Sequence, residues 1–158
     1  MADAIRLIKR TGPGCLLAKT DIKSAFRIIP IHQNDHTLLG MKWRRLYYSD
    51  RCMPMGCSSS CKIFETFSTA IEWIARHKLN INKLLHFLDD FLFLSSTRTQ
   101  CQGDLDRFLI FCSHLGIPIA PEKNCGSATT LTFAGIELDS IKSEAHLPKD
   151  KIAKCVQS

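Results

Sequence analysis

Several features that would assign a chain to a membrane or to a secretory route are missing from this sequence. Its 158 residues contain no apolar run close to the roughly 18 residues that span a bilayer. The N-terminal stretch MADAIRLIKRTGPG is interrupted by Asp3, Arg6, Lys9 and Arg10, so it has no apolar core of a signal peptide. We therefore expect an intracellular protein of the cytoplasm or nucleus, with no membrane partner.

The eight cysteines lack the spacing of a zinc site, and long runs of like charge are absent. Cys52, Cys57 and Cys61 include no C-x-x-C pair, which disfavours zinc, and without a signal peptide the thiols are interpreted as reduced. The 21 Lys and Arg residues exceed the 15 Asp and Glu residues, giving a net charge of +6. This excess is compatible with a polyanionic partner such as nucleic acid, and equally with a basic solvated surface.

What is present is an alternation of apolar segments and turn residues over a length typical of one domain. It predicts, in order, a helix over Ala2–Arg10, strands over Cys15–Ile22 and Arg27–Ile31, a hairpin of Leu38–Trp43 and Leu46–Tyr48, a helix from Ser58 to about His77, a hairpin of Leu84–Leu88 and Phe91–Leu94, a helix closed by Gly116, a strand pair within Leu131–Leu138, and a helix starting at Lys149. Strands interleaved with two longer helices predict an α+β fold, in which two helices pack on one face of an antiparallel sheet.

The segment HFLDDFLFL places two adjacent carboxylates, Asp89 and Asp90, in one of the most apolar stretches of the chain. Burying unpaired like charges is costly, so the pair must reach water, hydrogen-bond donors or cations. A hairpin with the two aspartates as its two-residue turn satisfies this requirement, and so does a metal site. The two interpretations are compatible, because a tight turn between buried strands is a rigid support for metal ligands.

A third carboxylate, Asp21, ends an apolar strand, as Asp89 does in its own hairpin. A lone aspartate at a strand end is usually a turn or cap residue. If the two strands are adjacent and antiparallel, however, both carboxylates reach one edge of the sheet. Such a group is suited to hold two Mg²⁺ ions about 4 Å apart for phosphoryl transfer.

The series TDIKSAFRIIPI, CMPMGCSSSCKIFE, HFLDDFLFL, LGIPIAPEKN and LTFAGIELD resembles the successive palm motifs of reverse transcriptases, in the family's order and over nearly the whole chain. The stretches GPGCLLAKTDIKSAFRIIPIH and LTFAGIELDS are especially similar to DIRS-like retrotransposons, and gypsy-like and retroviral enzymes are more distant. The resemblance implies a polymerase palm with a partial fingers hairpin over residues 1–158, with upstream fingers, thumb and RNase H absent.

The resemblance also implies roles for individual residues. Asp21, Asp89 and Asp90 match catalytic metal ligands, and Lys123 matches the lysine proposed to protonate the pyrophosphate, although it is equally explained as a surface lysine. The expected nucleotide-binding residues are Ile22, Lys23, Ser24, Ala25, Phe26, Met55 and Gly56, with Phe26 as the steric gate at the sugar 2′ position. The expected primer and template contacts are Phe87, Leu88, Phe133, Ala134 and Gly135.

The function implied is RNA-directed DNA polymerase, which adds dNMPs to a primer 3′ end with two Mg²⁺ ions, or Mn²⁺, as cofactors. Its partners would be an RNA or DNA template with primer, dNTPs, and the rest of a pol polyprotein with RNase H. A catalytically inactive palm that binds nucleic acid or a protein is the alternative. An RNA-dependent RNA polymerase is disfavoured by Phe26, since RNA synthesis needs room for the 2′-hydroxyl.

Overall fold

The computed structural model describes residues 1–148 and 151–152. The helices are α1 (Ala2–Thr11), α2 (Ser58–Lys78) and α3 (Arg98–His114), and the strands are β1 (Leu16–Asp21), β2 (Gly40–Trp43), β3 (Leu46–Ser49), β4 (Leu84–Phe87), β5 (Asp90–Ser95), β6 (Cys125–Ala128), β7 (Thr130–Phe133), β8 (Ile136–Asp139) and β9 (Glu144–His146). Three of the four predicted helices are confirmed, α1 and α2 within one residue at each end and α3 ending two residues before Gly116. The fourth, predicted from Lys149, falls largely outside the described residues.

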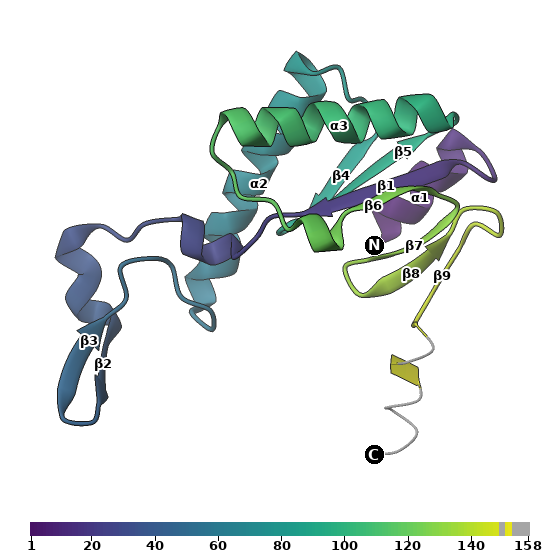
Figure 1. Ribbon diagram of the computed structural model, residues 1–158. Helices are drawn as coiled ribbons and strands as arrows, with labels where there is room; N and C mark the ends of the chain where they lie inside the picture. Colours follow the sequence, from purple (N-terminus) through teal and green to yellow (C-terminus); the bar gives the residue numbers. More distant parts are fainter. Residues whose placement is uncertain (149–150, 153–158) are drawn as a thin grey trace.

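A four-stranded antiparallel sheet in the order β4-β5-β1-β6 forms the centre of the molecule. Helices α2 and α3 cover one of its faces (Figure 1). There, Phe91 and Phe93 of β5 pack with Phe64 of α2 and Phe108 of α3, and all four rings are inaccessible to solvent. The predicted arrangement of two helices on one face of an antiparallel sheet is therefore confirmed.

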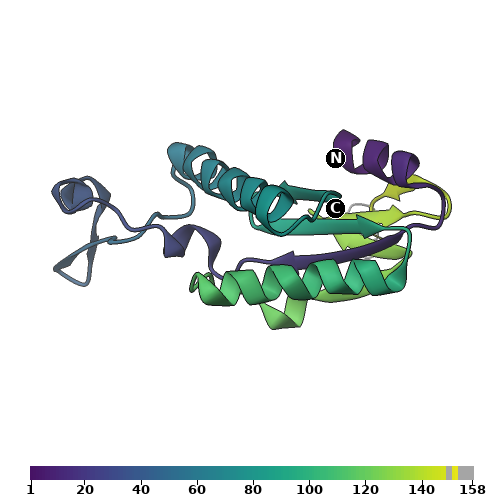
Figure 2. The ribbon, with the colours of Figure 1, turned by 90° about the horizontal axis from the view of Figure 1, so that it is seen from above.

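The opposite face of the sheet is covered by α1 and by a separate three-stranded sheet, β7-β8-β9 (Figure 2). Because side chains alternate along a strand, Leu92 and Leu94 of β5 point to this face and pack in a second core with Ile8 of α1. The same alternation places Asp90, and Asp21 opposite it on β1, on this face. The face that carries the carboxylates is thus the one away from α2 and α3.

The strand predicted over Arg27–Ile31 is wrong. Residues Ala25–Ile28 form a 3-10 helix, and the chain beyond it makes one isolated bridge, between Pro30 and Cys52. The apolar side chains of this run pack against the α2 core instead of alternating across a sheet. Strands β6 and β9 and the 3-10 helices Gln33–Leu39 and Pro121–Lys123 were not expected, because their short polar sequences carry no period-2 pattern.

The hairpin predicted around Arg44-Arg45 is present as the two-stranded sheet β2–β3, which projects away from the central sheet (Figure 1). Every residue of its two strands is exposed. In the described part of the chain, none of the helices is both long and apolar enough to cross a membrane.

Candidate nucleotidyl-transfer site

Asp21 ends β1 and is paired with a lysine from a distant segment. The residue is 5% exposed, and the Lys123 ammonium donates to both carboxylate oxygens at 2.9 Å. The segment before Lys123 is held against the end of β1, because the Ala120 amide donates to the Asp21 carbonyl at 2.9 Å. The hydrogen bond to Asp21 raises the pKa of Lys123. A cationic group therefore already neutralises this buried carboxylate.

Asp89 lies at the second position of the turn between β4 and β5, not at the first position as predicted. The turn residues are Leu88 and Asp89, whereas Asp90 begins β5 and pairs with Phe87. The Asp89 carbonyl accepts a hydrogen bond from the Ile22 amide at 3.0 Å, which attaches the turn to the residue after Asp21. Burial, together with the nearby charge of Asp21, raises the pKa of Asp89. This carboxylate therefore lacks the compensation that Asp21 receives.

Asp90 lies opposite Asp21 in the β1–β5 register, but it points to a third element. Its carboxylate accepts a hydrogen bond from the Ala134 amide, in the turn between β7 and β8, at 3.2 Å. Burial raises the pKa of Asp90, and the charges of Asp21 and Asp89 add to this while Lys19 opposes it. Across the described residues, no three His, Cys, Asp or Glu side chains are already arranged around a common metal position.

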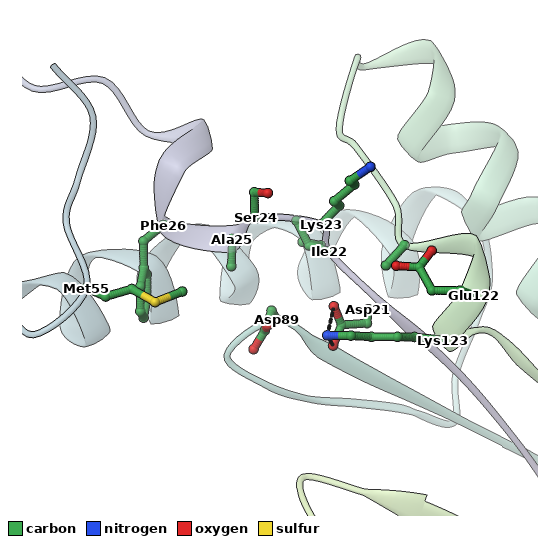
Figure 3. Close-up of a pocket in the computed structure, with 11 residues that line it drawn as sticks. Asp21, Ile22, Lys23, Ser24, Ala25, Phe26, Met55, Asp89, Glu122 and Lys123 are labelled. Carbon is green, nitrogen blue, oxygen red and sulfur yellow. Dashed lines mark hydrogen bonds and ion pairs between the residues drawn. The ribbon is translucent and has the colours of Figure 1, made fainter. Parts of the chain in front are cut away.

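A pocket of about 280 Å³ joins Asp21 and Asp89 to most of the predicted nucleotide-binding residues (Figure 3). Its lining comprises Asp21, Ile22, Lys23, Ser24, Ala25, Phe26, Met55, Asp89, Ala120, Glu122 and Lys123. Gly56 is outside this lining but adjoins Met55 and has a φ of 85°, which favours glycine. Glu122 was missed, because a lone acidic residue in a turn gives no sequence signal.

Phe26 closes the end of the pocket opposite Lys123 (Figure 3). Its ring packs edge-on against Phe64 of α2, with 5.4 Å between the ring centroids. The residue before the 3-10 helix, Ser24, has a left-handed φ of 54°, so the chain turns sharply between Asp21 and Phe26. Phe26 is therefore anchored to the core and still lines the pocket.

The residues predicted to contact primer and template divide into exposed and buried members. Phe87 is 55% exposed and Leu88 is half-buried, while Phe133 is buried in the second core. Ala134 and Gly135 form the β7–β8 turn with φ values of 48° and 76°. Through its amide, Ala134 connects this turn directly to Asp90.

The family model described as reverse transcriptase (RNA-dependent DNA polymerase) matches residues 2–138. Among curated proteins, none matches the sequence. The fold is similar to the foamy viral protease-reverse transcriptase in complex with dsDNA, with a TM-score of 0.74 and 17% identity over 90% of this chain and 28% of that chain. It is also similar to the same viral protein in complex with RNA/DNA hybrid, with a TM-score of 0.75 and 16% identity over 94% of this chain and 19% of that chain. The chain thus spans less than a third of these structural relatives.

Proposed function

We propose, from the premise that this chain belongs to the reverse transcriptase family, that it is the palm and part of the fingers of an enzyme that extends a primer by template-directed phosphoryl transfer. Family membership supports RNA-directed DNA polymerase activity in general, and the fold is that of the reverse transcriptase palm. Fingers, thumb and RNase H would come from other parts of a longer polyprotein. On the motifs quoted above, we place that polyprotein among DIRS-like retrotransposons.

Reverse transcriptases generally use divalent metal ions, and the acidic residues of this chain fit such a group. Three carboxylates from β1 and the β4–β5 hairpin supply the hard oxygen ligands that Mg²⁺ and Mn²⁺ prefer. The Lys123 ammonium on Asp21 is a cation at the position where one is needed, and Asp89 and Asp90 are half-buried without equal compensation. Two bound ions would activate the primer hydroxyl and neutralise charge on the phosphates. Asp21, Asp89 and Asp90 are the residues proposed to hold them.

The remaining pocket residues have roles that their positions support. The amides of Ile22 and Lys23 already donate to the Asp89 and Pro118 carbonyls, so those of Ser24 and Ala25 are the backbone donors proposed for a triphosphate. The ring of Phe26 would exclude a ribose 2′-hydroxyl. Lys123 is kept protonated by Asp21, which is the form required to protonate pyrophosphate. The dNTP is therefore expected between Phe26 and Lys123, the two ends of the pocket.

A primer–template is the proposed nucleic-acid partner. The relatives named above were solved with dsDNA and with RNA/DNA hybrid, and the net charge of +6 favours a polyanion. The β7–β8 turn, attached to Asp90 through Ala134, would position the primer end beside the carboxylates. A palm that binds a duplex but does not extend it is the alternative outcome.

The observation that carries this proposal is that Asp21 and Asp89, from separate motifs, line one pocket with Phe26. Primer extension by the full-length polyprotein tests it. Asp89→Asn keeps the size of the side chain but removes the charge, so extension should fall by at least ~100-fold with duplex binding little changed. Asp106→Asn, on the exposed side of α3, is the matched control. Undiminished extension by Asp89→Asn would remove Asp89 from the site, and wild-type binding without extension would favour the inactive palm.

A further inference from the structure

The residue before Asp89 has a backbone conformation that its side chain disfavours. Leu88 has a φ of 52°, in the left-handed region where a Cβ atom crowds the following carbonyl. Asn, Asp and Gly adopt this region readily, whereas leucine does so rarely. A leucine held there needs support from outside the turn.

Helix α2 supplies that support through a buried serine. The Ser68 hydroxyl donates to the Leu88 carbonyl at 2.6 Å, and Ser68 is inaccessible to solvent. Ser68 lies on the buried face of α2 between two apolar residues, Phe64 and Ile71. A buried hydroxyl costs stability unless it is hydrogen-bonded, so the bond to Leu88 explains a serine at this position.

A second α2 side chain holds the other polar group of Leu88. The Leu88 amide donates to Glu65 at 3.3 Å. Glu65 also accepts a hydrogen bond from His86 of β4 at 3.1 Å, and the other ring nitrogen of His86 contacts Glu72. Arg76 then joins Glu72, at 2.7 Å, to the Leu84 carbonyl. The amide and the carbonyl of Leu88 are therefore both bound by α2.

These contacts fix the backbone on both sides of Asp89. The peptide before it is held by Ser68, and the peptide after it is held by the Ile22 amide, which donates to the Asp89 carbonyl. Between these two attachments, the Asp89 side chain faces the pocket that it shares with Asp21. Electrostatic repulsion between the two carboxylates favours their separation, so the attachments act against it.

We propose that Ser68 is a positioning residue, whose hydroxyl holds Leu88 in its left-handed conformation and thereby aims Asp89 at Asp21. Glu65 is the second support of the same residue. The inference rests on the proposed function, because it assigns Ser68 to the carboxylate site of a nucleotidyl transferase. Supports of this kind typically change metal affinity or activity by 10–100-fold when removed.

Amide hydrogen exchange and Mn²⁺ binding, measured on this chain, test the assignment. Ser68→Ala should accelerate exchange of the Leu88 amide by roughly 5- to 10-fold and weaken Mn²⁺ binding by about 10-fold. The control is Ser140→Ala, which removes an equally buried hydroxyl that donates at 2.6 Å to the carbonyl of Cys15, at the opposite end of β1 from Asp21. This control should match Ser68→Ala in melting temperature and leave both other measurements unchanged.

A substitution at Leu88 tests the mechanism itself. Glycine adopts a positive φ without crowding, so in a Leu88→Gly background the loss of the Ser68 hydroxyl should change Mn²⁺ affinity less than in the wild type. Equal effects in both backgrounds, or a Ser68→Ala variant indistinguishable from Ser140→Ala, would overturn the positioning role. If the wild-type chain binds no Mn²⁺, the proposed function loses support, while exchange at Leu88 still decides whether Ser68 holds the turn.

Discussion

Three hairpins in the described part of the chain have two-residue turns, and two of them, β4–β5 and β2–β3, maintain unusual backbone conformations in different ways. In β4–β5 the left-handed residue is Leu88, held by the buried Ser68 and the exposed Glu65 of α2. In β2–β3 both turn residues, Arg44 and Arg45, are left-handed, with φ values of 46° and 68°. That turn matches the right-handed twist of its strands and is exposed, so local geometry is sufficient.

The strands of these two hairpins also differ in how far they are buried. Five of the six residues of β5 are buried, whereas all eight residues of β2 and β3 are exposed. Met41, Trp43, Leu46 and Tyr48 share one face of the β2–β3 ribbon by its register. The Lys42 ammonium lies 5.2 Å from the Tyr47 ring, and the Arg44 guanidinium lies 5.7 Å from the Trp43 ring. The β4–β5 hairpin is stabilised by tertiary contacts, and β2–β3 by its own strands.

The largest expected effect on the free energy of unfolding comes from removing a buried aromatic ring of β5. Removing an exposed ring of β2 provides the comparison. Phe91 of β5 is inaccessible to solvent and packs against Phe108, with 4.9 Å between the ring centroids. Phe91→Ala should lower the free energy of unfolding by about 3–5 kcal/mol, as for other buried aromatic residues. Trp43→Ala, at a residue 63% exposed, should change it by about 0.5 kcal/mol or less. Urea unfolding measures both, and similar losses would mean that β2–β3 belongs to the cooperative core.

A smaller effect is expected at Phe26, which packs on the helix that supports the β4–β5 turn. Its substitution is followed by two measurements, sugar selectivity and melting temperature. Its ring contacts Phe64 of α2 and lines the pocket. Phe26→Val should improve ribonucleotide relative to deoxyribonucleotide insertion by roughly 10-fold, about 1–3 kcal/mol of steric discrimination. The ratio of rNTP to dNTP incorporation by the full-length enzyme, measured alongside the melting temperature, checks it. Lost stability with unchanged sugar selectivity would make Phe26 a core residue alone.

The helices and strands of the central sheet were easier to predict from the sequence than the β4–β5 turn. Helix α2 follows from the spacing of Phe64, Phe67 and Ile71, and β1 and β5 follow from apolar runs of strand length. The turn was placed one residue too late, because local preference favours Asp over Leu in a left-handed conformation. A hydrogen bond from Ser68, twenty positions earlier, decides the outcome, and no local pattern encodes it.

The candidate site was likewise predicted only in part. The motifs predicted that Asp21 and Asp89 converge, and the structure brings them to one pocket with Phe26 and Lys123. The ion pair between Lys123 and Asp21 was not predicted, because the two residues are 102 positions apart and meet through the backbone pairing of Ala120 with Asp21. Their roles in catalysis remain predictions that the experiments above address.

His86 should make the stability of the β4–β5 hairpin depend on pH. Burial by itself lowers the pKa of His86, but the hydrogen bond and charge of Glu72, with Glu65, raise it overall. A raised pKa in the folded state means a contribution that is complete below the ordinary value of about 6.5 and lost as pH rises through the folded value. His86→Gln should therefore cost on the order of 1 kcal/mol near pH 6 and less near pH 9.

Urea unfolding at several pH values measures this difference. The control is His114→Gln, at an exposed histidine that ends α3. A cost of His86→Gln that is constant from pH 6 to pH 9 would mean that the ring acts through packing and not through its charge.

The smallest effect on the free energy of unfolding is expected at the exposed turn of β2–β3. A substitution there tests whether the turn is determined by its own backbone or by contacts with the rest of the protein. Arg45 has a φ of 68°, and no tertiary hydrogen bond to its backbone is seen among the described residues. Glycine adopts this conformation without crowding but is more flexible in the unfolded chain, so these two contributions oppose each other. Arg45→Gly should therefore change the free energy of unfolding by about 0.5 kcal/mol or less. Amide exchange in β2 and β3, compared with β4 and β5, shows which hairpin responds. If Arg45→Gly altered exchange in β4–β5, the two hairpins would be coupled, and the contrast between a locally determined turn and a tertiary one would not hold.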